Sequence, residues 1–185
     1  MKNCINKEIA QYFITDSIDF LNRFKIFEKH STHIGSRSKL LTELLFSTEC
    51  ILKALIFIES DLDEKQTYRK ARKAGHNINK LINKLKPESQ NKFKTLIKTD
   101  LSKFAVYNRY QLESEIDFRE ESGVLGKKYY NTIANFNWLN RVYEEIEKFV
   151  KYVQNKIPIN LEPINFSDIN IDLEQEKHYR IINIR

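Results

Sequence analysis

Apolar residues recur at three- and four-residue steps over most of this chain, the spacing expected for one buried face of an α-helix. The pattern predicts helices over residues 5–28, about 36–60, 65–73, a short one opened by His76 and Asn77, 88–109 and 128–155. The segment 36–60 is the most apolar of these. We therefore expect it at the centre of a helical bundle.

Local residue types predict where several of these helices begin and end. Ser36 suits the N-cap of the second helix, and Asp61 or Asp63 suits the N-cap of the third, because these side chains accept hydrogen bonds from free backbone amides. Gly75 stands where a glycine would end the third helix. Pro87 should open the helix that follows, since its fixed φ suits a first turn.

Two segments break the helical pattern. Residues 110–127 are acidic and hold two glycines, which predicts a surface loop that could fold over a basic partner segment. From Pro158 onward apolar residues alternate with polar ones, and Pro163 disfavours a central strand. We therefore expect a helical bundle over 1–156 and an extended C-terminal arm over 157–185 that packs on the bundle or on another subunit.

Composition agrees with helix and excludes several classes of protein. Among 185 residues there are only 4 glycines and 3 prolines, so a turn-rich β-sandwich is disfavoured. Mean hydropathy is −0.54, and no apolar run is long enough to cross a membrane. The N-terminus lacks an apolar signal region, and Cys4 and Cys50 need not pair. We expect a cytoplasmic protein with no membrane partner.

The positive charge is concentrated in one segment. Residues 65–109 hold 13 lysines and arginines against two acidic residues, a net charge of +11, whereas the whole chain carries +6. Such a segment can bind the phosphates of RNA or of a nucleotide. The alternative is a solvated face in a chain that is rich in lysine throughout.

His76 is the residue best placed for chemistry. It follows Gly75 at a helix junction, close in sequence to Arg69 and Arg72. Neighbouring cations favour a neutral imidazole, which can deprotonate a ribose 2′-hydroxyl while arginine holds the phosphate. The alternative is a residue that caps or packs the helix. His30 and His33 have no local partners for a metal site, so no metal or other cofactor is expected.

Two further groups could assist this histidine. Glu49 and Lys53 are one turn apart in the most apolar helix, so they form either an exposed ion pair or a buried pair that orients His76 or Arg109. Tyr107 and Tyr110 flank Arg109, a set suited to stacking a base and holding a phosphate. The same arginine could instead complement a helix dipole.

The order of these features resembles the HEPN superfamily (higher eukaryotes and prokaryotes nucleotide-binding), in particular its bacterial members. Ser47-x-Glu49-x-x-x-Lys53 lies in an apolar helix and is followed by Gly75-His76-Asn77-Ile78 and then by the Arg109-Tyr110 pair. The resemblance covers about residues 5–155. It implies an all-α, up-and-down antiparallel bundle that forms a homodimer and acts in RNA cleavage, phage defence or toxin–antitoxin systems, with a cognate antitoxin as a further partner.

Active members of that superfamily carry, late in the bundle, an arginine separated from a histidine by four to six residues. No histidine follows Arg109 at that spacing, and Arg69 and His76, which have six residues between them, lie earlier in the chain. The sequence therefore predicts an RNA- or nucleotide-directed protein, at most a metal-independent endoribonuclease with His76 as base and Arg109 and Arg69 at the phosphate. Binding is assigned to Arg72, Lys73, Tyr107, Tyr110, Lys53 and Glu49. The alternative is a catalytically inactive module for binding nucleotide or a partner, or for dimerisation.

Overall fold

The computed structural model describes residues 2–104 and 106–157, without the side chains of residues 2–4 and 109. This part contains eight α-helices, two short 3-10 helices and no strand, so the all-α prediction is confirmed. The proposed C-terminal arm lies outside the described residues. None of the described helices combines the length and the apolar character that crossing a membrane requires.

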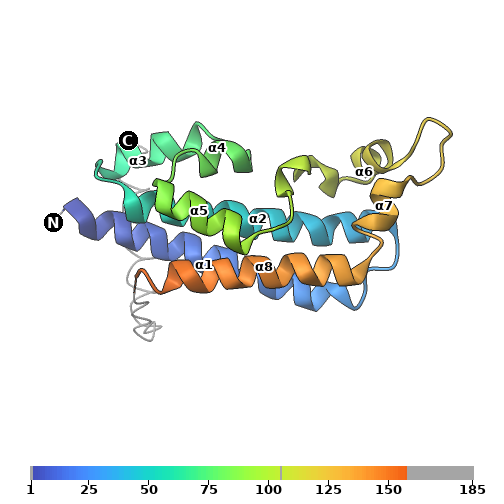
Figure 1. Ribbon diagram of the computed structural model, residues 1–185, viewed down its shortest axis with the longest axis horizontal. Helices are drawn as coiled ribbons and strands as arrows, with labels where there is room; N and C mark the ends of the chain where they lie inside the picture. Colours follow the sequence, from blue (N-terminus) through green and yellow to red (C-terminus); the bar gives the residue numbers. More distant parts are fainter. Residues whose placement is uncertain (1, 105, 158–185) are drawn as a thin grey trace, which may run out of the picture.

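Three long helices form the centre of the molecule: α1 (Lys2–Glu28), α2 (Ile34–Glu59) and α8 (Phe136–Gln154). They lie side by side along the long axis in Figure 1. As expected, α2 is the central element, because it contacts α1 and α8 as well as the shorter helices around them. Its leucines and isoleucines are buried, and that burial provides most of the driving force for packing the bundle.

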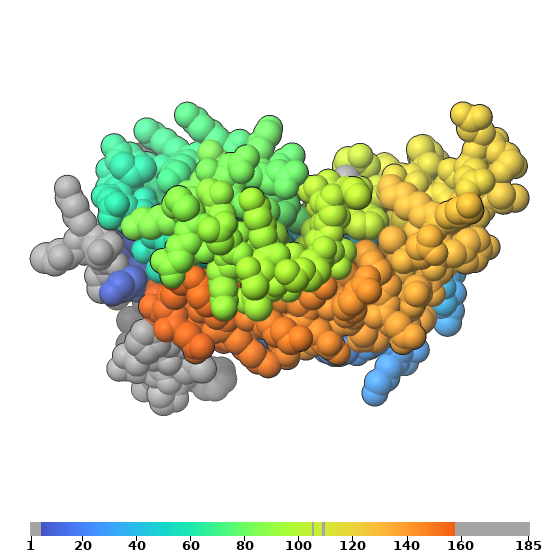
Figure 2. Space-filling model, in the orientation of Figure 1, coloured from blue at the N-terminus to red at the C-terminus, as the bar shows by residue number. Residues whose placement is uncertain are grey.

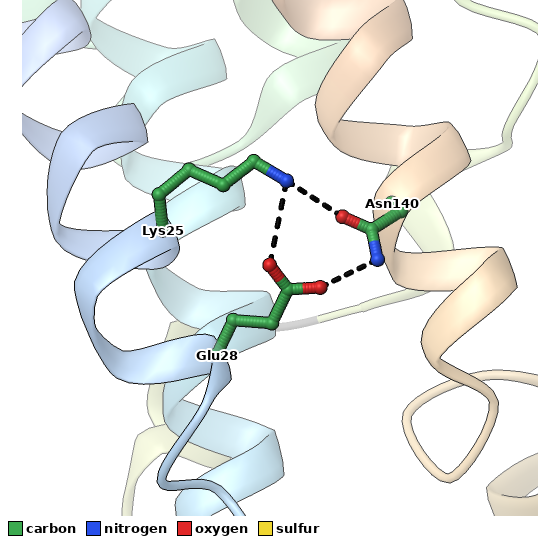
Figure 3. A network of polar contacts seen from close by, with 3 residues as sticks. All are labelled: Lys25, Glu28 and Asn140. Carbon is green, nitrogen blue, oxygen red and sulfur yellow. Dashed lines mark hydrogen bonds and ion pairs between the residues drawn. The ribbon is translucent and has the colours of Figure 1, made fainter.

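A polar network joins the first and last long helices where α1 ends (Figure 3). Lys25 Nζ donates to Asn140 Oδ1 at 2.8 Å, and Asn140 Nδ2 donates in turn to Glu28. Lys25 also pairs with Glu28 at 3.4 Å and lies over the Tyr143 ring, 4.3 Å from its centroid. Each residue of this network therefore bonds two others, which fixes the register of α1 against α8.

The short helices lie at the two ends of this core (Figure 1). Near one end are α3 (Glu64–Arg72), α4 (Ile78–Ile82) and α5 (Pro87–Leu96). The predicted boundaries are confirmed here: Asp63 Oδ1 caps α3 by accepting from the Gln66 amide at 2.8 Å, and Pro87 opens α5.

The start of α2 differs from the prediction. Ser36 is not the N-cap but lies in the first turn, and His33 is the N-cap. His33 Nδ1 accepts from the Ser36 amide at 3.4 Å, while the His33 amide donates to Ser36 Oγ at 3.2 Å. The imidazole nitrogen thus replaces the oxygen of a usual capping residue, and α2 gains two residues.

The single helix predicted over residues 88–109 is wrong. After α5 the chain leaves the helix and forms two 3-10 turns, η1 (Leu101–Lys103) and η2 (Val106–Arg109). The buried Glu145 carboxylate of α8 accepts from the amides of Lys98 and Thr99, each at 3.0 Å. These bonds satisfy amides that would otherwise stay in the helix, and so they favour the break.

The acidic segment is not only a loop, because it contains the helix α6 (Gln111–Phe118). Phe118 enters the core, and the hydroxyl of buried Ser114 donates to the Asn108 carbonyl. Acidic residues of α6 pair locally, as Asp117 does with Lys128. This helix packs mainly on α2 and η2, so it meets the basic segment at its end and does not cover α3 or α4.

The last predicted helix, 128–155, is interrupted. A short α7 (Lys127–Asn131) precedes α8, which begins after the N-cap Asn135. The Arg37 guanidinium of α2 donates to the Ala134 carbonyl and to the Tyr129 hydroxyl, both at 3.4 Å. A side chain almost a hundred residues away therefore holds the kink between α7 and α8.

Candidate functional site

Glu49 is the buried centre of the candidate site. It lies in the middle of α2 and only 4% of its surface is exposed. Lys53 Nζ, one turn later, donates to Glu49 Oε1 at 2.6 Å, and the Lys53 side chain is 20% exposed. The alternative that Glu49 and Lys53 form an exposed ion pair is therefore wrong. The ammonium group thus gives the carboxylate a charge-assisted hydrogen bond inside the bundle.

The turn between α3 and α4 presents His76 to this carboxylate. Gly75 has φ +58°, a left-handed conformation that glycine adopts without strain, as its predicted position at a helix end requires. On either side of the turn Ala74 and Ile78 are buried in the core, and Asn77 Oδ1 caps α4 by accepting from the Lys80 amide at 2.8 Å. The imidazole therefore projects from a backbone that is anchored on both sides.

The imidazole and the carboxylate meet directly. His76 Nδ1 lies 2.7 Å from Glu49 Oε2, across 27 residues of sequence. An ionised carboxylate only accepts hydrogen bonds, so Nδ1 must carry the hydrogen and donate it. The other ring nitrogen, Nε2, then keeps a lone pair. Since 62% of the His76 side chain is exposed, this nitrogen can accept a proton from a ligand.

Two hollows meet at His76. One, of about 200 Å³, is lined by Phe13, Lys53, Tyr68, Ala71, Arg72, Gly75 and His76. The other, of about 360 Å³, is lined by residues 74, 76–78, 102, 104, 106 and 107. Because His76 belongs to both, the exposed imidazole stands between two spaces, each with aromatic side chains in its wall.

The predicted cations of α3 are placed differently from one another. Arg72 lines the hollow with His76, whereas Arg69 is exposed on α3 and does not line it. Tyr68, Ala71, Arg72 and Gly75 share one helical stripe that ends at the turn, and Arg69 lies beside this stripe. Lys73 is exposed at the end of α3. The structure thus brings Arg72 toward His76 and does not bring Arg69 there.

The aromatic pair that flanks Arg109 is divided between two sites. Tyr107 lines the hollow of about 360 Å³ with His76. Tyr110 lines a different hollow, on the far side of Phe46. The backbone of Arg109 belongs to η2, but its side chain lies outside the part that the structure describes.

Comparison with known proteins yields no relative. No family model matches the chain, no curated protein matches it, and no solved structure matches it. The site must therefore be interpreted from its own geometry.

Some residues of the site were not singled out from the sequence. Phe46 packs edge-on against the imidazole, with ring centroids 6.2 Å apart, and Phe13 lies under the Lys53 ammonium group, 5.8 Å from it. Tyr68 lines the smaller hollow. The helical spacing of Phe46, Glu49 and Lys53 along α2 was the one available signal.

The surface around the site is basic. Most lysines and arginines of α3, α4 and α5 are exposed, and these helices cover one side of the molecule above α8 (teal to green above orange, Figure 2). Among the described cations of residues 65–103, only Lys103 forms an ion pair, with Asp100. Over residues 2–104 and 106–157, no group of histidine, cysteine and acidic side chains could hold a metal ion. The arrangement is suited to binding a phosphate chain beside a histidine base.

Proposed function

We propose that this chain is an RNA-directed protein of HEPN-like type and acts as a metal-independent endoribonuclease at His76. One observation carries the proposal: a buried carboxylate holds Nδ1 of an exposed imidazole, on the basic side of the bundle and in a hollow shared with Arg72. A base oriented by a carboxylate and a cation for the phosphate are the two groups that cleavage through the 2′-hydroxyl requires.

In the proposed reaction His76 Nε2 takes the proton of a ribose 2′-hydroxyl. The 2′-oxygen attacks the neighbouring phosphorus, and the bond from phosphorus to the 5′-oxygen breaks. The leaving 5′-oxygen takes a proton from water, and the hydroxide that remains takes the proton of the imidazolium, which restores the base. The products are a 2′,3′-cyclic phosphate and a 5′-hydroxyl. Glu49 stabilises the imidazolium that forms, and Arg72 stabilises the negative charge on the phosphate oxygens.

Other predicted residues take supporting roles in this proposal. Lys53 holds the other oxygen of the Glu49 carboxylate, and Tyr107 offers a ring on which a neighbouring base can stack. Arg69, Lys73 and Arg109 remain predicted phosphate-binding residues along the chain of the RNA. Whether each of them contacts RNA depends on the path of the bound strand, so their roles stay predictions.

Cleavage of a labelled RNA in the presence of EDTA tests the proposal. Wild-type protein should cut, and His76→Ala should bind but not cut. His33→Asn is the matched control, since it removes a histidine outside the site and leaves a good N-cap on α2. If no cleavage occurs, or if His76→Ala cuts as well as wild type, the nuclease proposal is wrong.

The alternative is a catalytically inactive HEPN-like module that binds nucleotide or a partner through the same surface. The breadth of the basic surface favours it, because exposed cations continue along α5, beyond the two hollows beside His76. Salt-dependent RNA binding without cutting would support this alternative. Arg72→Gln should lower the slope of log affinity against log salt by about one, whereas Arg141→Gln on α8 should not change it.

We also propose a homodimer, with a role in bacterial defence or as the toxin of a toxin–antitoxin pair. Leu112 and Ile116, one turn apart on α6, are both exposed, and an exposed apolar pair of this kind supports an interface. Light scattering should give twice the chain mass for wild type and a monomer for Leu112→Glu. A monomeric wild type would contradict the proposed homodimer.

A further inference from the structure

A hollow of about 620 Å³ lies beside the candidate site and has no role in the chemistry described so far. It is lined by Phe27 near the end of α1, His30 in the turn that follows, Lys39, Leu40, Glu43 and Phe46 from α2, and Tyr110 at the start of α6. Its volume falls within the range of about 300–1,000 Å³ that small-molecule sites occupy. A nucleoside-sized ligand would fit in it.

The hollow adjoins His76 through one shared side chain. Phe46 lines the hollow, and its ring contacts the imidazole edge-on at a centroid distance of 6.2 Å. Along α2, Phe46 lies three residues after Glu43 and three before Glu49, so its ring lies next to both the hollow and the carboxylate that holds His76. A strand whose phosphate lies at His76 therefore has this hollow within reach of a neighbouring base.

Most of the wall is apolar and aromatic. Phe27, Leu40, Phe46 and Tyr110 offer flat or aliphatic surfaces, which suit the faces of a planar ring. Lys39 and His30 also line the hollow, and both are exposed. They can therefore contact the phosphate or ribose of a ligand. Tyr110, predicted from the sequence to stack a base, lies in this hollow rather than with Tyr107.

Glu43 is the one acidic residue among the described residues that line this hollow. Its side chain is 18% exposed, and Oε2 lies 3.2 Å from Arg23 Nε but accepts no hydrogen bond. Burial raises the pKa of the Glu43 carboxyl group, while the Arg23 guanidinium opposes that rise. Because Oε2 is buried beside Arg23, the acceptor left for an N–H donor that enters the hollow is the other carboxylate oxygen, Oε1.

We propose that this hollow is a nucleobase pocket, in which Glu43 accepts from the amino group of guanine, adenine or cytosine while Phe46 and Tyr110 pack on the ring. The inference rests on the proposed RNA function for the class of ligand, and it adds base preference to that function. Uracil lacks an exocyclic amino group and should be the poorest ligand. Carboxylates recognise base amino groups in the same way at nucleic-acid interfaces.

Calorimetric titration of the full chain with GMP, AMP, CMP and UMP tests the pocket. At least one amino-bearing nucleotide should bind about tenfold more tightly than UMP. Glu43→Gln keeps the side-chain shape and should reduce this ratio to near one. Phe46→Leu should weaken all four nucleotides, because it removes a ring and keeps an apolar side chain. Glu147→Gln on α8 is the matched control and should leave the ratio unchanged.

The outcomes separate this inference from the proposed nuclease. Equal binding of all four nucleotides, no binding, or an unchanged ratio in Glu43→Gln would overturn the pocket even if RNA is cut. His76→Ala should retain the base preference, since its ring lies outside the hollow. A base preference without RNA cleavage would support the pocket and overturn only the nuclease. The circular dichroism spectrum of Glu43→Gln must first match that of wild type. If it does not, Phe46→Leu tests the pocket instead, and unchanged binding of the four nucleotides by that variant would overturn the proposal.

Discussion

Replacing Glu49 by glutamine tests the central contact of the site most directly. The amide keeps the shape of the carboxylate but has one acceptor and one donor. With its oxygen toward the Lys53 ammonium group, its NH₂ group faces His76 Nδ1 and requires a lone pair there. The hydrogen of the imidazole then moves to Nε2, which can no longer act as a base. Cleavage should fall by roughly 10²–10⁴-fold, because the wrong tautomer blocks proton transfer.

The cost to stability can be worked from the same two contacts. A hydrogen bond to a charged group contributes about 1.5–3 kcal/mol, and a neutral one about 0.5–1.5 kcal/mol. Removing the carboxylate charge should therefore cost each contact about 1 kcal/mol, although Lys53 itself stays charged. The Lys53 contact should count nearly in full, since that side chain is mostly buried, whereas exposure of His76 weakens the second contact. We expect a total loss of about 1–2 kcal/mol, or about 3–6 °C in Tm for a chain of this size.

Three measurements on Glu49→Gln check this reasoning: RNA cleavage, chemical denaturation and the nitrogen NMR shifts of the imidazole. Wild type should show hydrogen on Nδ1 and the variant should show it on Nε2. Glu147→Gln, which breaks an exposed pair with Lys151, should leave all three unchanged. If Glu49→Gln keeps the wild-type tautomer and cuts at the wild-type rate, the carboxylate does not orient the base and the reasoning fails.

Two further substitutions and one alkylating reagent test the scaffold. Gly75→Ala should lose about 1 kcal/mol in urea denaturation, because φ +58° disfavours any side chain although no atom lies near its Cβ; unchanged stability would contradict the strained turn. Asn140→Ala should lose about 1 kcal/mol by removing the link between α1 and α8, and an equally stable variant would show that the network is not needed. Burial, with the Glu49 carboxylate next, raises the pKa of the Cys50 thiol to about 12. Since only the thiolate reacts, mass spectrometry should find Cys50 unalkylated at pH 8 until the protein is unfolded; rapid native alkylation would contradict this.

The sequence predicted the fold where the determinants are local. Asp63, Gly75 and Pro87 mark helix boundaries through their own backbone chemistry, and the structure has those boundaries in place. The break after α5 could not be predicted in this way, because the carboxylate that favours it belongs to Glu145, 46 residues beyond Thr99. The kink before α8 likewise depends on Arg37, whose side chain donates to a carbonyl 97 residues later in the chain.

The site shows the same division. The pairing of Glu49 with Lys53 follows from their four-residue spacing, and the exposure of His76 follows from its place after a glycine. Whether Glu49 faced His76 stayed an alternative, since contact across 27 residues depends on how α3 packs on α2. Which of Arg69 and Arg72 faces His76 depends on the helical phase at the end of α3. A helix boundary shifted by one residue would change that phase.

The buried serines between α1 and α2 restrict how the candidate site can move. Ser17 Oγ lies 2.9 Å from the Ser47 carbonyl oxygen, and Ser47 Oγ lies 2.9 Å from the Ser17 carbonyl oxygen. Sliding one helix past the other by a turn, about 5.4 Å, would break both bonds between residues that have no exposed surface. Glu49, two residues further along α2, therefore keeps a fixed height in the bundle. The His76 imidazole therefore takes its position from a carboxylate that the serine pair fixes relative to α1.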